Sequence, residues 1–209
     1  MIEPNKFALF VAASWALILV PGPDMLYVIT RGMTHGRGAG IVSAVGVISG
    51  ILVHTTAAAL GITLIFQSSA SAFLVVKYLG ALYLMYHGVK TWRDTGTFNP
   101  QTSSTGVSSR SLFWQGVLSN VLKPKIAVFF LAFLPQFVDQ GNGQITLQMT
   151  ILGLTFALFG LCFLVVVGYF AGSFGTWLTN QPRYTTSLRW LSGGILFVLG
   201  ARLAFIEQR

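Results

Sequence analysis

Two short proline-containing stretches hold the residues whose types suit chemistry in this chain. The first, Pro21-Gly22-Pro23-Asp24, stands inside an otherwise apolar run from Phe7 to Thr30 that is long enough to cross a bilayer. A prolyl ring removes a backbone donor and clashes with the carbonyl four residues back, so a helix should break here. Irregular backbone and an acid at membrane depth are tolerated only where protein or a water-filled cavity covers them. The stretch therefore predicts a binding site.

The second stretch, Lys123-Pro124-Lys125, interrupts another apolar run just after Asn120, a polar residue that we expect to face the same cavity. A charge at mid-bilayer costs at least about 2.5–3.5 kcal/mol, so Asp24 and the lysines should each face the interior or find a partner. An ion pair between Asp24 and a lysine of this stretch would neutralise both charges.

Two interpretations of these charges and prolines stay open. In the first, the prolines only kink the helices, and either the ion pair only fixes their packing or the lysines extend to the interface from a shallow segment. In the second, Asp24 attracts a substrate ammonium or titrates with a coupling proton, while a lysine attracts a carboxylate. The ends of broken helices present free N–H and C=O groups, which suit both charges of a zwitterion.

A third group of residues is spaced for one helical face. Gly46, Gly50 and His54 lie four positions apart, and small residues of this kind let helices approach closely. Gly50 and His54 are thus candidates to line the same site. His54 is either a hydrogen-bonded packing residue or a proton carrier, since its ordinary titration range suits the latter.

The composition places these residues in a membrane. Of the 209 residues, 54% are hydrophobic and 9% are charged, whereas a soluble domain carries about 25% charged residues. The net charge of +8 comes from basic residues that mostly lie between apolar runs, which indicates membrane orientation and not nucleic-acid binding. The lone Cys162 allows no internal disulfide or thiolate cluster, so no metal or cofactor is expected.

About 20 apolar residues span the hydrocarbon core, and by this rule the chain should cross six times, each time as a helix. The predicted crossings are Phe7 to Thr30, Ala39 to Phe66, Ser71 to Trp92, Leu112 to Val138, Ile145 to Gly172 and Leu188 to Ile206.

The connections differ in charge. The first, third and fifth, with their flanks, hold the basic residues Arg31, Arg37, Lys90, Arg93, Arg110, Arg183 and Arg189. The second and fourth contain no lysine or arginine. The positive-inside rule then predicts that both termini are extracytoplasmic. Lys77 lies about six residues inside the third crossing, within reach of the interface, so a role as an anchor is favoured over a role in binding.

The two halves of the chain resemble each other. Residues 77–90 align without gaps to residues 189–202, so that Gly88 matches Gly200, and the first and fourth crossings each contain a proline break. Three crossings per half force the second copy to enter from the opposite side, so the repeats should be inverted. The fold prediction is therefore one all-α domain over 1–209, with repeats of about 7–93 and 112–206 and a polar linker over about 94–111.

Taken together, these motifs resemble the LysE/RhtB family of bacterial amino-acid exporters. The matching elements cover Phe7 to Phe205 and are Pro21 to Asp24, Gly36-Arg37-x-x-Gly40, Gly46 to His54, Lys77-x-x-Gly80-x-x-Tyr83-Leu84, and Asn120 to Phe137. The resemblance implies a six-helix inner-membrane exporter of amino acids, driven by the proton motive force. The family's usual Asn-Pro-Lys stands here as Lys123-Pro124-Lys125, which adds a cation.

The sequence thus favours proton-coupled export of amino acids by alternating access, with a site formed by Pro21, Gly22, Pro23, Asp24, Gly50, His54, Asn120, Lys123, Pro124 and Lys125. The expected partners are an amino acid, H⁺ and the lipid bilayer, and the glycine faces are compatible with a homo-oligomer. Two alternatives belong to other classes. A non-transporting scaffold leaves the paired proline breaks unexplained, and a membrane-embedded enzyme lacks a catalytic set of residues.

Overall fold

The computed structural model describes residues 2–19, 22–68, 70–93, 107–139 and 143–171, with single positions between 173 and 204. The described residues form helices and no strand, which confirms the all-α prediction. The elements are α1 (Pro4–Ile18), α2 (Pro23–His35), α3 (Arg37–Ser68), α4 (Ala70–Arg93), α5 (Ser109–Val121), α6 (Pro124–Ala132), the 3-10 helix η1 (Leu134–Phe137) and α7 (Ile145–Tyr169).

These elements follow the predicted segments. The second, third and fifth are single helices, whereas the first and fourth are each divided, as their internal prolines require. The bend between α1 and α2 is 51°. Most of the sixth predicted segment lies outside the described residues, as do Pro21 and residues 94–106 of the linker. The predicted end of the linker was too late, because α5 already starts at Ser109.

Among the described helices, α3 over Arg37–Gly61 and α7 are long and apolar enough to cross a membrane, and α1 with α2 makes a third if the bent pair is one span. Six crossings in two inverted repeats therefore stay a prediction.

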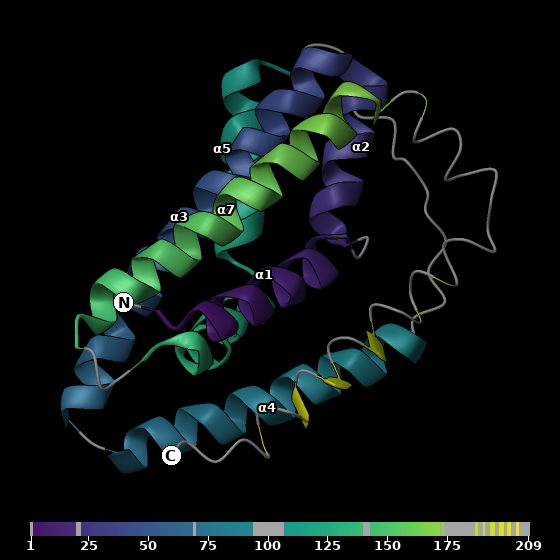
Figure 1. Cartoon of the computed structure of the whole chain (residues 1–209). Helices are drawn as coiled ribbons and strands as arrows, with labels where there is room; N and C mark the ends of the chain where they lie inside the picture. The colour runs from purple at the N-terminus through teal and green to yellow at the C-terminus, as the bar shows by residue number, and fades with distance from the viewer. Residues whose placement is uncertain are drawn as a thin grey trace.

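Helix α3 is central and packs on α7 through small residues. A Cβ added at Gly40 would lie 2.7 Å from the carbonyl oxygen of Gly168, and one at Gly153 would lie 2.2 Å from Thr55. As residue numbers rise along α3 they fall along α7, so the two helices are antiparallel (Figure 1). The backbones touch, because glycine leaves no side chain between them.

Helix α5 packs on another face of α3 in the same way. A Cβ at Gly46 would lie 2.3 Å from the carbonyl oxygen of Phe113, and one at Gly116 would lie 2.9 Å from that of Ser43. The predicted glycine face on the second segment is thus a real helix–helix seam, and it runs from Gly46 to Gly50.

A single residue connects α2 to α3. Gly36 follows His35 and has φ +87° and ψ 172°, a conformation in which a Cβ would be strained. The turn is as short as a connection between two helices can be, and it requires glycine.

Helix α4 lies apart from α3, α5 and α7 in Figure 1. Ala81 of α4 packs with Ala132 of α6 beside Leu17 of α1. Helix α4 also contacts described positions of the last segment: Trp92 stacks on Trp190, with ring centroids 5.7 Å apart, and its Nε1 donates to the Trp190 carbonyl at 2.9 Å. Helix α4 therefore joins the last segment to the rest of the molecule.

The interior is apolar and rich in aromatic rings, including the fully buried Phe10, Phe130 and Phe133. The outer surface is apolar as well, since many leucines on α3, α4, α5 and α7 are exposed. An outer surface of this kind suits lipid, because a soluble monomer rarely exposes so large an apolar area.

The glycine seam between α3 and α7 predicts the effect of one added methyl group. Gly40→Ala should destabilise the fold by about 1–3 kcal/mol, because its Cβ would overlap the backbone of α7. Unfolding by SDS in mixed micelles would measure this. The matched control is Gly38→Ala in the same helix, where a Cβ meets nothing within 4 Å. Equal stability of the two variants would contradict the close packing.

Candidate functional site

The two helix breaks bring two helix N-termini to one place. Helix α2 starts at Pro23 after the extended Gly22, and α6 starts at Pro124 after the extended Lys123. Proline suits the first helical position, because its missing N–H would have no partner there. Neither Gly22 nor Lys123 caps its helix with a side chain. Both starts therefore present positive helix-dipole ends.

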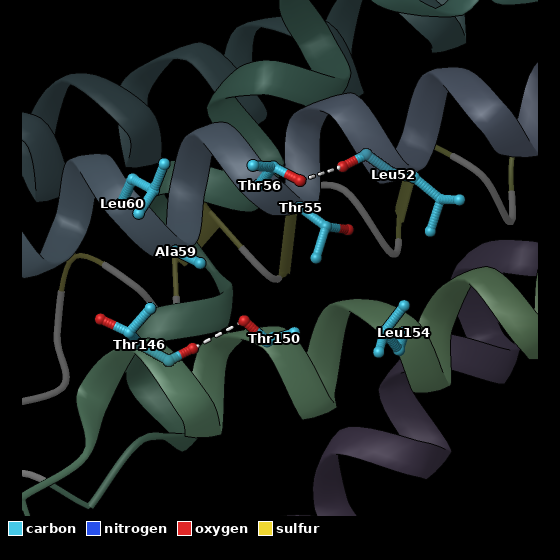
Figure 2. A pocket seen from close by; sticks show the side chains of 8 residues that line it. All are labelled: Leu52, Thr55, Thr56, Ala59, Leu60, Thr146, Thr150 and Leu154. Atoms are coloured by element: carbon cyan, nitrogen blue, oxygen red, sulfur yellow. Dashed lines mark hydrogen bonds between the residues drawn. The ribbon is translucent and has the colours of Figure 1, made fainter.

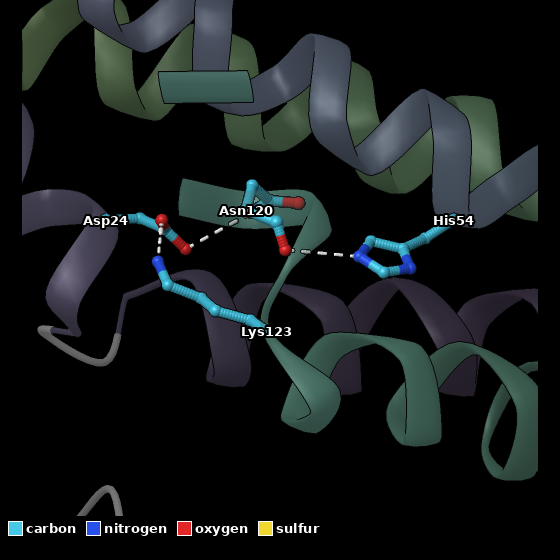
Figure 3. Close-up of polar contacts among 4 residues, drawn as sticks. All are labelled: Asp24, His54, Asn120 and Lys123. Atoms are coloured by element: carbon cyan, nitrogen blue, oxygen red, sulfur yellow. Dashed lines mark hydrogen bonds and ion pairs between the residues drawn. The ribbon is translucent and has the colours of Figure 1, made fainter. Parts of the chain in front are cut away.

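Asp24 and Lys123 form an ion pair between these two helix starts (Figure 3). Asn120 adds a second contact, because its Nδ2 donates to the other carboxylate oxygen of Asp24 at 3.4 Å. The side chains of Asp24 and Lys123 are 23% and 22% exposed, so the pair is shielded but accessible. The predicted ion pair is confirmed, and Lys123 supplies its lysine.

Asn120 and His54 extend this polar cluster to α3. Asn120 is fully buried and His54 is 8% exposed. The Asn120 carbonyl oxygen lies 3.2 Å from His54 Nε2 (Figure 3). A carbonyl can only accept, so Nε2 carries the proton in this contact. One chain of contacts thus extends across α2, α3, α5 and the start of α6. It joins four of the predicted site residues: Asp24, Lys123, Asn120 and His54.

Gly50 lies on the face of α3 that packs on α5, and it leaves room for the side chain of Asn120. A Cβ at Gly50 would lie 2.7 Å from the Cβ of Asn120 and 3.0 Å from its Oδ1. Glycine therefore sets how closely the asparagine approaches α3. Among the remaining predicted site residues, Pro21 and the side chains of Pro124 and Lys125 lie outside the described residues.

Two polar contacts that the sequence analysis did not anticipate continue the interface between α2 and α5. Tyr27 donates its hydroxyl to the Leu112 carbonyl at 2.7 Å, and Arg31 Nη2 donates to Gln115 Oε1 at 2.9 Å. Arg31 was expected in a loop, but α2 continues to His35. Asp24, Tyr27 and Arg31 are spaced three and four residues apart, and this helical period was the available signal.

Lys77 departs from its predicted role. It is 5% exposed, and its Nζ lies 5.4 Å from the centre of the Tyr78 ring. The ammonium therefore does not extend to the surface, so the prediction of an interfacial anchor is wrong. The fold buries this side chain, and the sequence alone does not place the residues that surround it.

A separate hollow of about 420 Å³ lies between α3 and α7 (Figure 2). Its lining consists of leucines, an alanine and threonines: Leu52, Thr55, Thr56, Ala59, Leu60, Thr146, Thr150 and Leu154. The hydroxyls of Thr55, Thr56 and Thr150 donate to carbonyls of their own helices, four residues back. The hollow therefore offers mainly methyl groups, and it suits a charged ligand less well than the Asp24 cluster does.

Comparison with known proteins now adds to this geometry. The sequence pattern of the LysE type translocator matches residues 15–206. The chain belongs to this family. As a LysE type translocator, it is a membrane transport protein and not an enzyme.

Curated relatives cover nearly the whole translocator. The homoserine/homoserine lactone efflux protein of Salmonella typhimurium is 29% identical over 93% of this chain and 94% of its own length. The leucine efflux protein of Enterobacter sp. is 30% identical over 97% of this chain and 96% of its own. An uncharacterized membrane protein of Bacillus subtilis is 28% identical over 89% of this chain and 92% of its own. No solved structure matches the chain.

The ion pair predicts a coupling between two residues far apart in the sequence. Asp24→Asn and Lys123→Gln should each destabilise the translocator by about 1–3 kcal/mol, because each leaves a shielded charge unpaired. The double variant should lose less than the sum, with a coupling energy of about 1–2 kcal/mol. SDS unfolding of all four proteins measures this cycle.

The matched control is the exposed pair of Glu3 and Lys6, whose charged atoms lie 3.7 Å apart. The cycle of Glu3→Gln and Lys6→Gln should give a coupling below about 0.5 kcal/mol, because water screens it. Equal coupling in the two cycles would contradict the shielded pair at Asp24.

Proposed function

We propose that this translocator is a secondary exporter of amino acids or small amino-acid derivatives across the bacterial inner membrane. The observation that carries this proposal is the accessible ion pair of Asp24 and Lys123 at two helix starts inside a membrane protein. A carboxylate and an ammonium side by side match the two charges of an amino acid. The bacterial relatives named for efflux of leucine and of homoserine support the same substrate class.

The proposed architecture is six crossings in two inverted repeats. The seam between α4 and the last segment supports it. A Cβ at Gly88 would lie 2.7 Å from the carbonyl oxygen of Gly193, and a Cβ at Gly200 would lie 2.7 Å from that of Ala81. The repeat alignment pairs Gly88 with Gly200 and Ala81 with Gly193. The contact between Gly88 and Gly193 therefore corresponds to the contact between Gly200 and Ala81. A two-fold axis that relates inverted copies requires this correspondence.

The proposed orientation has both termini outside. The turn between α2 and α3, the end of α4 and the start of α5 bear Arg37, Lys90, Arg93 and Arg110, and α1 starts near the opposite end of α3 (Figure 1). By the positive-inside rule, the basic end faces the cytoplasm.

Transport proceeds in this proposal by alternating access, with protons driving export. The contacts of Tyr27 with Leu112 and of Arg31 with Gln115 close the interface between α2 and α5 on the basic side of the ion pair. Opening toward the cytoplasm breaks them and admits substrate. Asp24 then holds either a substrate ammonium or a proton, so a proton arriving from outside releases the amino acid.

Efflux from proteoliposomes tests the export function. Vesicles loaded with a panel of labelled amino acids, including leucine and homoserine, should release at least one of them faster than protein-free vesicles. A pH gradient, acidic outside, should accelerate this release, because it supplies protons to the outward-facing site. Release of no amino acid under either condition would refute the proposal.

The variant Asp24→Asn tests whether the substrate ammonium and the coupling proton both bind to the Asp24 carboxylate. The variant should export at least about tenfold more slowly, and its residual rate should no longer respond to the pH gradient, because the amide neither holds an ammonium nor takes up a proton. Glu3→Gln, a remote and exposed acid, is the matched control and should behave as the wild type. Gradient-driven efflux that is unchanged in Asp24→Asn would exclude a coupling role.

A further inference from the structure

The carboxylate of Asp24 already has partners before any substrate arrives. The Lys123 ammonium occupies Asp24 Oδ1, and Asn120 Nδ2 occupies Oδ2. A substrate ammonium that takes the place beside Asp24 Oδ1 therefore displaces Lys123. Entry is therefore an exchange of ionic partners and not the filling of an empty carboxylate.

The exchange leaves Lys123 in need of an anion. The sequence has five acids, Glu3, Asp24, Asp94, Asp139 and Glu207, and Asp24 alone falls within a predicted crossing. Apart from Asp24, the predicted crossings therefore offer a displaced Lys123 no acid, and an unpaired charge in a shielded site is costly. The positive starts of α2 and α6 lie at the same place and raise the need for a negative group.

A zwitterionic amino acid meets this need itself, because its carboxylate takes the place of Asp24 beside Lys123. Four charges then form two pairs, and the net charge of the site does not change. An amine without a carboxylate would satisfy Asp24 and leave Lys123 unpaired. A carboxylate without an amine would satisfy Lys123 and leave Asp24 unpaired.

We propose that Lys123 is a specificity-determining residue that restricts the site to substrates carrying both an ammonium and a free carboxylate. Lactones, amides and decarboxylated derivatives of the same amino acids are rejected. This inference rests on the export function proposed above and narrows its substrate class.

Matched substrate pairs test the inference on the wild-type protein. Unlabelled leucine should inhibit efflux of labelled leucine, whereas leucinamide and 4-methylpentanoate, which each lack one charged group, should inhibit at least about tenfold less well. Homoserine and homoserine lactone form a second pair for efflux of labelled homoserine. The measurements need a pH at which the amines are protonated.

The variant Lys123→Gln identifies the residue responsible. It removes the cation, keeps a side chain of similar length, and leaves Asp24 free for any ammonium. The preference for leucine over leucinamide should fall at least about tenfold. The control Lys6→Gln removes an exposed cation elsewhere and should keep the wild-type preference.

The outcomes separate the two proposals. Export of no amino acid would refute the transport function. Export with equal inhibition by leucine and leucinamide, or by homoserine and its lactone, would refute the selectivity alone. If Lys123→Gln folds, as a monodisperse elution profile would show, and keeps the full preference, the role of Lys123 is refuted. If it does not fold, the wild-type comparison still decides whether the carboxylate is required.

Discussion

The ion pair between Asp24 and Lys123 is the constraint on which the arrangement depends. It joins residues 99 positions apart in the sequence. These residues lie at the starts of α2 and α6, where the chain becomes helical again after a break. A charge in a membrane protein must be paired or hydrated, and these two satisfy each other. The prolines break both helices at this point, and the breaks place the two helix starts beside the pair.

Close packing around α3 holds the pair in place. Glycines let α7 approach one face of α3 and α5 approach another, and Gly50 brings Asn120 against the same helix. Asn120 in turn contacts Asp24 through its side chain and His54 through its carbonyl oxygen. The polar cluster is therefore fixed by backbone contacts that have no tolerance for added volume.

The sequence predicted the helix breaks and the pairing of Asp24, because proline and buried charge act through local and general physical rules. It did not distinguish Lys123 from Lys125, since the choice depends on Lys123 being the extended residue before α6. The hydrogen bond of His54 to the Asn120 carbonyl could not be predicted from the sequence either, because every residue has a backbone carbonyl. The buried Lys77 shows that neighbouring helices, which the sequence does not place, decide where a long side chain ends.

The one-residue turn at Gly36 has a mechanical meaning. It leaves α2 little room to pivot on α3, so Asp24 and His54, carried on these two helices, should travel as parts of one rigid elbow. Asn120 moves with the same unit, because α5 packs on α3 through glycines. Lys123 lies beyond the end of α5, where Leu122 and Lys123 separate α5 from α6. The anion thus belongs to the rigid elbow and the cation to the short link between two helices, so a change of backbone conformation in that link would alter the distance between the two charges.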